Sequence, residues 1–409
     1  MHVVYPRCCG LDVHKETIAA CMLIADESGQ KVKHRRTFPT MTRDLLELAD
    51  WLRSEQITHV AMESTGVYWK PVWNILDGSF DLLLINAQHI KAVPGRKTDV
   101  KDAEWIADLL QHGLLHGSFV PSQSIRDLRD LTRYRAILTQ ETAEIANRIQ
   151  KVLEDANIKL AAVATDVLGV SGTRMLEAII AGENDSEALA QMAVRRLRAK
   201  MEHLRLALQG KIRDHHRFLL RKLLDHLHFV EGKIAELDTE IERLMQPYQT
   251  TVDRWMEIPG IQKVTAWNLV AEIGVNPKQF PSPAHLASWA GLCPGNNESA
   301  GKRKSGKTRK GSPWLRRALS QAAWAASHTK ATYLSARYKR LALKRGAKRA
   351  IVAIAHKLLL IAYHLLKYDL HYKDLGANFY DRLQIDRLRQ YLVKRLESLG
   401  HQVTLSPVP

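Results

Sequence analysis

A run of apolar residues between positions 220 and 244 constrains the fold of this chain more than any other feature. Its members recur at alternating steps of three and four: Leu220, Leu223, Leu227, Val230, Ile234, Leu237, Ile241 and Leu244. This period places them on one stripe of an α-helix and is typical of coiled coils. Pro247 ends the pattern, and 125–153 offers apolar positions for a partner helix. We expect a helical, coiled-coil segment over 121–248, and we favour a role in assembly over an arm within one chain.

The chain has 409 residues, which is too long for one small domain. Hydrophobic residues make up 45% of it, so a sizeable core is expected and global disorder is excluded. The four cysteines form no CxxC pair and no cysteine–histidine metal spacing. A disulfide framework and a zinc finger are therefore not expected, and a reducing cytoplasm fits this usage.

Two segments bear on membrane association. The first ten residues lack the pattern of a signal peptide, and the most apolar run, 351–366, contains His356, Lys357 and His364. This run is shorter than the roughly 20 clean apolar residues of a membrane span, so we expect a buried helix. We accordingly expect a bacterial cytoplasmic protein, associated with the nucleoid rather than with a membrane.

Positive charge is concentrated near the carboxyl end. The net charge is +17, and 299–368 contains 18 Lys or Arg without a single Asp or Glu. Such a surface suits a polyanion, because each cation can neutralise one phosphate and release a counterion. A solvated basic tail is disfavoured by residues of buried type in the same stretch: Trp314, Leu315, Leu319, Trp324, Leu358 and Ile361. The basic residues expected to contact nucleic acid are Lys302, Arg303, Lys304, Lys307, Arg309, Lys310, Arg316 and Arg317.

The first 120 residues have the pattern of a mixed α/β domain. Expected strands are 8–13, 17–25, 31–38, 58–63 and 81–85, and expected helices are 45–52 and 99–110. The first two strands form a hairpin, and later strands alternate with helices. This order predicts a mixed sheet flanked by helices.

Four acidic residues stand out by position in this domain. Asp12 and Glu63 end apolar strands, and Asp99 and Asp102 lie three apart at the start of a helix. Each has an ordinary structural explanation, such as a helix cap for Asp99 or a turn for Asp12. Together they favour a site for Mg²⁺, or Mn²⁺, which binds carboxylate oxygens and substrate phosphates. Two such ions can clamp the attacking and leaving oxygens of a phosphoryl transfer.

The carboxyl-terminal part offers two further features. The segment 258–261 (IPGI) is a tight turn between helices, and it fits a phosphate-binding turn and an ordinary helix hairpin equally well. Ser299, Ser305 and Ser312 all lie in the basic loop. A serine hydroxyl is a weak nucleophile that needs a base or a metal to activate it. The residues alone do not choose among the three.

Several motifs together resemble a known family. GLDVHK, MESTGVYW, INAQHIKAVPGRKTDVKDA, IPGIQKVTA, WAGLCPGNNESAGKRKSGKTRKGSPWLRRAL and AIAHKLLLIAYHLL occur in this order. They resemble the DEDD transposases of the "one-ten" insertion-sequence family. The likeness covers the first and the last ~115 structured residues, whereas the middle, about 155–209, looks longer than in compact members.

The resemblance implies an α/β RNase H-like (RuvC-like) domain over 1–120 and a helical coiled-coil segment over 121–248. A mainly α transposase domain over 249–370 and a tail over 371–409 complete the chain. It also implies four metal-binding acids, at Asp12, Glu63, Asp99 and Asp102, and a nucleophilic serine at Ser299. Members act as tetramers on element ends and target DNA, and a noncoding guide RNA directs them. For this chain we accordingly expect a homo-oligomer, a dimer or a tetramer. The implied reaction is strand cleavage and exchange through a covalent phosphoserine.

Other functions remain open at this point. A RuvC-like junction resolvase would share the carboxylates but use water as the nucleophile. An actin-like or sugar-kinase-like ATPase also begins with a strand and Gly-x-Asp, but it needs Gly and Thr where this chain has Val13 and His14. A nucleic-acid-binding scaffold without activity explains the charge but not the acids.

Overall fold

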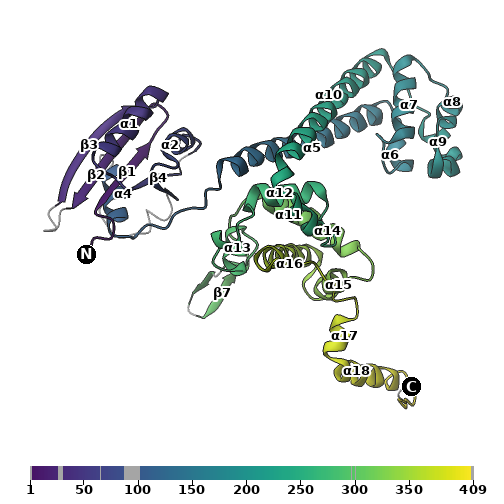
Figure 1. Ribbon diagram of the computed structural model, residues 1–409. Helices are drawn as coiled ribbons and strands as arrows, with labels where there is room; N and C mark the ends of the chain where they lie inside the picture. The colour runs from purple at the N-terminus through teal and green to yellow at the C-terminus, as the bar shows by residue number, and fades with distance from the viewer. Residues whose placement is uncertain are drawn as a thin grey trace. The chain divides into compact units, whose positions relative to one another are not determined.

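The computed structural model divides the chain into two compact units, Met1–Val120 and Pro121–Pro409 (Figure 1). The structure describes residues 2–25, 31–64, 66–86, 102–295, 297–299 and 301–406. At 297–299 and 302–304 only the backbone is described. Each unit is treated by itself below.

A five-stranded sheet forms the centre of the first unit. Its order is β3-β2-β1-β4-β5, with β1 (Arg7–Val13), β2 (Thr17–Ala25), β3 (Lys31–Pro39), β4 (His59–Glu63) and β5 (Asp81–Ile85). β1, β2 and β3 are antiparallel neighbours, whereas β4 and β5 run parallel to β1. The predicted mixed sheet and its leading hairpin are confirmed.

Helices cover both faces of this sheet. On one face, α1 (Thr42–Ser54) and α2 (Trp69–Leu76) bury their apolar sides against Leu11 and its neighbours. On the other face, α4 (Asp102–Gln111) packs against Cys8 and the strands beside it. Because successive side chains of a strand point to opposite faces, Cys8, Gly10 and Asp12 share the side that α4 covers.

Gly10 allows α4 to lie unusually close to β1. A Cβ at this position would lie 2.3 Å from the Ala103 carbonyl oxygen and 2.5 Å from the Ala107 amide nitrogen. Both are backbone atoms of α4, so no side-chain rotation can relieve the clash. The glycine therefore sets the distance between the helix and the strand that carries Asp12.

We expect Gly10→Ala to destabilise the packing of α4 by about 1–3 kcal/mol, as overpacking of a close-packed interior does. Hydrogen exchange of α4 peptides, followed by mass spectrometry, measures the effect. Gly232→Ala is the control, because a Cβ there meets nothing within 4 Å. Unchanged exchange of α4 in the Gly10 variant would contradict the packing described here.

The second unit begins with a long helical hairpin. α5 (Gln123–Asp155) and α10 (Asp214–Met245) pack against each other along their length. Residues of the heptad stripe, including Leu220, Leu227 and Val230, are buried in a shared core with Ile145 and Ile149 of α5. The expected partner helix is confirmed. The favoured assembly role is corrected for this stripe, because α5 of the same chain occupies it; the oligomeric state stays a prediction.

Short helices close the far end of this hairpin. They are α6 (Leu160–Val163), α7 (Val170–Ala181), α8 (Ser186–Gln191), η1 (Arg195–Lys200) and α9 (Met201–Ala207). Their apolar residues join the core between the end of α5 and the start of α10 (Figure 1). The long middle segment is therefore a group of short helices that shares its core with the end of the hairpin. We call it the end cluster.

The carboxyl-terminal bundle follows the hairpin through η2 (Gln246–Tyr248). Its helices are α11 (Gln249–Met256), α12 (Lys263–Ile273), η3 (Pro277–Gln279), α13 (Pro283–Trp289), α14 (Pro313–His328), α15 (Tyr333–Arg345) and α16 (Ala347–Tyr368). A two-stranded ribbon, β6 (Asn297–Ser299) and β7 (Lys302–Ser305), projects between α13 and α14. Beyond the bundle lie α17 (Phe379–Leu383) and the exposed helix α18 (Ile385–Glu397).

α16 is the central helix of this bundle. Its length and composition alone would suit a membrane span. However, it packs against α14, α15 and α13, and it buries Ile354, Leu358 and Leu359 in the protein. Trp255 of α11 donates its indole N–H to the Ala362 carbonyl at 3.0 Å. The expected buried helix is thus what the structure shows.

The structure also bears on the turn at 258–261 and on Trp324, for which the sequence raised expectations. Gly260, in the turn between α11 and α12, has φ +88°, and a Cβ there would lie 2.3 Å from the Ala322 carbonyl oxygen of α14. The turn is therefore covered by α14 and serves packing, which favours the ordinary hairpin over a phosphate-binding turn. Trp324, taken from the sequence as a residue of buried type, is instead 61% exposed, so that expectation is wrong.

Candidate active site

Asp12 and Glu63 lie at the same edge of the sheet. β1 and β4 are parallel neighbours whose register pairs Leu11 with Met62, and Asp12 and Glu63 are the next residue on each strand. Paired positions of parallel strands present their side chains to the same face. The two carboxylates therefore occupy adjacent strand ends on the face that α4 covers.

α4 runs antiparallel to β1 and brings Asp102 to this edge. The amide of Tyr5 donates to the Gln111 carbonyl at 3.1 Å, so the end of α4 lies beside the start of β1. Ala103 and Ala107 contact the position of Gly10 in the middle of the strand. Asp102, the first residue of the helix, consequently lies toward the end of β1 that carries Asp12.

Three of the four predicted acids are thus directed to one edge of the sheet. Asp99 lies outside the described residues. Glu63 and Asp102 are half-buried, and each has an interaction partner. The Asp12 side chain is 20% exposed, and its Oδ2 lies 3.1 Å from Nε2 of His14, which is 62% exposed.

The donors at this edge fit a hard divalent cation. They are carboxylate oxygens, which Mg²⁺ and Mn²⁺ prefer. Cys8 lies on the same face, but burial raises the pKa of its thiol to about 12. Burial also raises the pKa of the Cys21 thiol, on the neighbouring strand. Both therefore remain protonated at neutral pH and are poor metal ligands, since the thiolate is the form that binds metal.

The predicted nucleophile lies in the second unit. Ser299 ends β6 and pairs with Lys302 of β7 in the projecting ribbon, and its side chain is among those that are not described. The basic residues Lys302, Arg303 and Lys304 form most of β7, so the serine is flanked by a basic strand.

The other two serines of the basic loop have structural roles. The Ser305 Oγ accepts a hydrogen bond from the Lys307 amide at 3.1 Å. Ser312 is the N-cap of α14 and accepts from the Leu315 amide, and its hydroxyl donates to Oε2 of Glu272 at 2.9 Å. The Ser312 hydroxyl is thus engaged both as donor and as acceptor, whereas the Ser305 hydroxyl accepts one hydrogen bond and keeps its own proton.

Glu272 is the centre of a buried ionic network. Its side chain is 2% exposed and accepts two hydrogen bonds from Arg133, at 2.7 and 3.1 Å. Arg129 donates to the carbonyls of Ala271 and Glu272 at 2.9 and 2.8 Å, at the end of α12. The network ties α5 and α12 to the start of α14.

The remaining predicted basic residues lie after the ribbon. Lys307, Arg309 and Lys310 are exposed, and Arg316 and Arg317 belong to the first turns of α14. Lys310, Arg316 and Arg317 line a shared hollow of about 450 Å³ with Ser320. These cations are therefore available to a polyanion on one surface of the bundle.

A second group of titratable residues escaped the sequence analysis. Asp155, His215 and His216 place three candidate ligand atoms within 4.8 Å of one another. However, Nε2 of His216 lies 2.7 Å from Asp155 Oδ2, and its Nδ1 accepts from the Arg213 amide at 3.1 Å. The hydrogen bond from His216 lowers the pKa of Asp155. With both ring nitrogens engaged and the Arg213 guanidinium 3.4 Å from the same carboxylate, this group serves to fasten α10 to α5.

Comparisons with known proteins agree with the motifs. A family model of DEDD transposases of IS110 type, described as "Transposase", matches residues 9–158. A second, described as "Transposase IS116/IS110/IS902 family", matches residues 252–339. The chain is 25% identical over 334 residues to a "Probable family 20 transposase" of Pseudomonas aeruginosa, covering 80% of this chain and 89% of that one. It is 24% identical over 372 residues to a "Pilin gene-inverting protein" of Moraxella bovis, covering 88% and 95%.

Proposed function

Because this chain belongs to the IS110 family of transposases, we propose that it is a metal-dependent DNA recombinase that cuts and rejoins strands at the ends of an insertion sequence. The observation that carries the proposal is the direction of Asp12, Glu63 and Asp102 to one sheet edge. Members of this transposase family process DNA, and one relative is named for inverting a gene.

We assign the first unit to the RNase H-like, RuvC-like class. Three antiparallel strands followed by two parallel ones, in the order β3-β2-β1-β4-β5, support the assignment. So does a carboxylate at the end of the central strand β1. In this reading Asp12, Glu63, Asp102 and Asp99 hold Mg²⁺ or Mn²⁺. The ion supplies positive charge that offsets the negative charge building on the scissile phosphate.

Ser299 is the proposed nucleophile. Its Oγ attacks the phosphorus of the scissile phosphodiester, the O–P bond to the serine forms, and the P–O bond of the strand breaks. The leaving strand oxygen takes up a proton, and the serine loses one. The hydroxyl of the incoming strand then reverses these events and releases the serine. Since each step exchanges one phosphodiester for another, no nucleotide hydrolysis is needed.

The surrounding cations position the DNA. Lys302 and Arg303 pair with the strand that carries the serine, and Lys304 follows them on β7. This nearness in the ribbon supports the proposal that the three cations hold the phosphates beside the cut. The site requires the ribbon of one unit to meet the carboxylates of the other, in the same chain or in a second copy. We expect a homo-oligomer, and from the family resemblance a guide RNA that selects both DNAs.

Carboxylate variants test the metal site. Asp12→Asn and Asp102→Asn are each expected to lower strand exchange at least about a hundred-fold, because a neutral amide holds a divalent cation far more weakly than a carboxylate does. Junction formation is measured by amplification from a plasmid that carries the element with its flanking noncoding DNA. Normal exchange by either variant would refute the assignment.

Asp108→Asn is the matched control for this experiment. Asp108 lies on the same helix and is half-exposed, 3.7 Å from Lys31, and the proposal gives it no role. Its variant should recombine as the original protein does. If purified protein instead produced cut DNA without any covalent adduct, water would be the nucleophile, and the junction-resolvase alternative would replace the recombinase.

A further inference from the structure

Trp324 is unusual among the aromatic residues of this protein. All nine tryptophans lie in described residues, and Trp324 is the one that is exposed. His328 stacks on it one turn further along α14, with ring centroids 4.2 Å apart and planes 36° from parallel. A single exposed apolar residue is common, so the residues around this pair decide its meaning.

The pair belongs to a row along one face of α14. Trp314, Arg317, Gln321, Trp324 and His328 follow one another at steps of three and four and therefore share one side of the helix. The opposite side is buried in the bundle. Trp314 lies between two guanidinium groups, with Arg133 5.8 Å and Arg317 5.7 Å from its ring centroid. The row thus alternates aromatic rings with polar and cationic groups.

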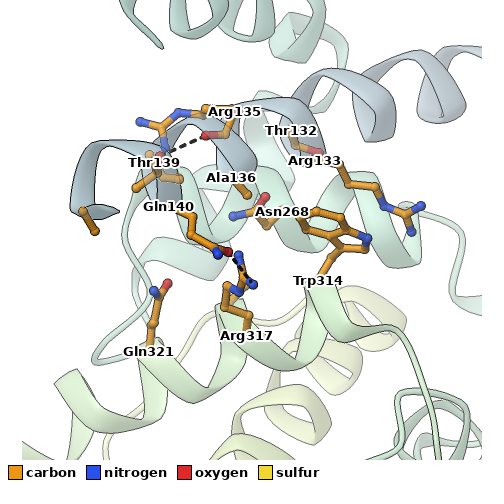
Figure 2. A pocket seen from close by; sticks show the side chains of 13 residues that line it. Thr132, Arg133, Arg135, Ala136, Thr139, Gln140, Asn268, Trp314, Arg317 and Gln321 are labelled. Atoms are coloured by element: carbon orange, nitrogen blue, oxygen red, sulfur yellow. Dashed lines mark hydrogen bonds between the residues drawn. The ribbon is translucent and has the colours of Figure 1, made fainter. Parts of the chain in front are cut away.

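The first three residues of this row, Trp314, Arg317 and Gln321, line a hollow of about 470 Å³ that α14 forms with α5 and α12 (Figure 2). Amide side chains of Gln140, Asn268 and Gln321 line it, and no Asp or Glu does. Figure 2 shows Gln140 of α5 and Arg317 of α14 reaching toward each other across the hollow, where the arginine donates to the amide oxygen at 3.2 Å. The hollow therefore offers neutral polar groups, one indole ring and three guanidinium groups.

The arginines of the hollow differ in their availability. Arg133 pairs with Glu272, and Arg135 pairs with Asp238. For Arg317, the part of the chain that the structure describes provides no carboxylate within ion-pair distance, and its contacts are the Gln140 amide and the Trp314 ring. Arg317 also lines the second hollow, with Lys310 and Arg316. Arg317, which no described carboxylate neutralises, therefore lines both the hollow that contains Trp314 and the hollow that contains Lys310 and Arg316.

The aromatic rings and cations on this face of α14 indicate which kind of ligand it binds. Aromatic faces that alternate with unneutralised cations bind unpaired nucleic acid, because bases stack on the rings while the cations neutralise the phosphates. Duplex DNA keeps its bases stacked inside and cannot use the Trp324 ring. A second copy of this protein would need an acidic patch to match Arg317, Lys310 and Arg316.

We propose that this face of α14, together with the hollow against α5, binds single-stranded DNA. Bases stack on the Trp324–His328 pair and on Trp314, and Arg317 and Arg316 neutralise the adjoining phosphates. The inference rests on the proposed function, since strand exchange must part the two strands of the duplex near the cut.

Binding of labelled oligonucleotides to the full-length protein tests the proposal. The probe is an oligothymidylate of about twenty nucleotides, read by fluorescence anisotropy in EDTA, so that no cleavage occurs. We expect Trp324→Ala to raise its Kd about five- to a hundred-fold, the loss of one stacked base, and Trp324→Phe to restore most of the affinity. Arg317→Ala should reduce the slope of log K against log salt by about 0.7.

Phe229→Ala is the matched control. Phe229 is an equally exposed aromatic residue, 62% accessible, on α10, with Lys233 5.7 Å from its ring, and it has no part in the row. Its variant should bind the oligothymidylate unchanged. An unchanged Kd for Trp324→Ala would overturn the proposal.

Two comparison ligands sharpen the result. A duplex of equal length should lose little affinity in Trp324→Ala, and equal losses on both DNAs would show that Trp324 does not recognise unpaired bases and would overturn the proposal. An oligouridylate that bound more tightly, with the same dependence on Trp324, would assign the face to RNA and overturn the assignment to DNA. This assay measures binding in the absence of metal, so its result does not depend on the strand-exchange experiment. A protein that binds the oligothymidylate through Trp324 but shows no strand exchange would contradict the proposed function and not the binding site.

Discussion

Replacing Ser299 with alanine is expected to reduce the covalent protein–DNA adduct to background while DNA binding stays intact. The Oγ atom is the one that bonds phosphorus in the proposed reaction, and alanine has no atom in its place. End-labelled DNA carrying the element end, quenched in denaturing detergent and resolved on a gel, shows the adduct as a retarded band. Binding of the same DNA is measured separately by mobility shift.

Ser305→Ala provides the comparison for this experiment. Ser305 lies in the facing strand of the same ribbon, pairs with Asn297, and uses its Oγ in a turn with the Lys307 amide. Its variant should form the adduct at the original level. An adduct that persists in Ser299→Ala and disappears in Ser305→Ala would move the nucleophile to the other strand. Persistence in both would remove the ribbon from the covalent step.

Replacing Glu272 with alanine is expected to destabilise the bundle by about 3–5 kcal/mol, the usual cost of removing one partner from a buried ion pair. The substitution leaves Arg133 with its charge partly buried and the Ser312 hydroxyl without its acceptor. Hydrogen exchange of α12 peptides reports the loss directly and avoids a two-state treatment of a chain with two units.

Two further variants separate the causes. Glu272→Gln keeps the shape and part of the hydrogen bonding, so it should cost less than alanine. Glu236→Ala removes an exposed pair with Lys233 on α10 and should change stability by no more than about 1 kcal/mol. Equal, small effects of all three substitutions would show that the network adds little to stability.

Much of the first unit could be predicted because strand signals there are local. The short apolar runs of β1, β2 and β5 identify strands without reference to tertiary structure. The acids could be chosen because Asp12 and Glu63 lie at the ends of apolar strands, and Asp99 and Asp102 at the expected start of a helix. Their direction to one edge depends on α4 running antiparallel to β1 and lying close at Gly10, and no spacing in the sequence encodes that contact.

In the second unit, the spacing of apolar residues identified the apolar side of a helix but not the helix that packs against it. The heptad stripe of α10 has the same pattern whether it meets α5 or another chain, and tertiary structure decides in favour of α5. Trp324 shows the converse, since a large aromatic residue in a helical stretch is ordinarily assigned to a core. What distinguishes Trp324 is its position on the side of α14 opposite the buried one, and that side is known only from the tertiary structure.

The unbroken run of α5 has a structural consequence. A helix of 33 residues extends about 50 Å at 1.5 Å per residue, and it has the end cluster at one extremity and the ionic network of Glu272 at the other. The same continuous helix therefore carries the packing of the end cluster and the buried ion pairs of the bundle, separated by most of its length.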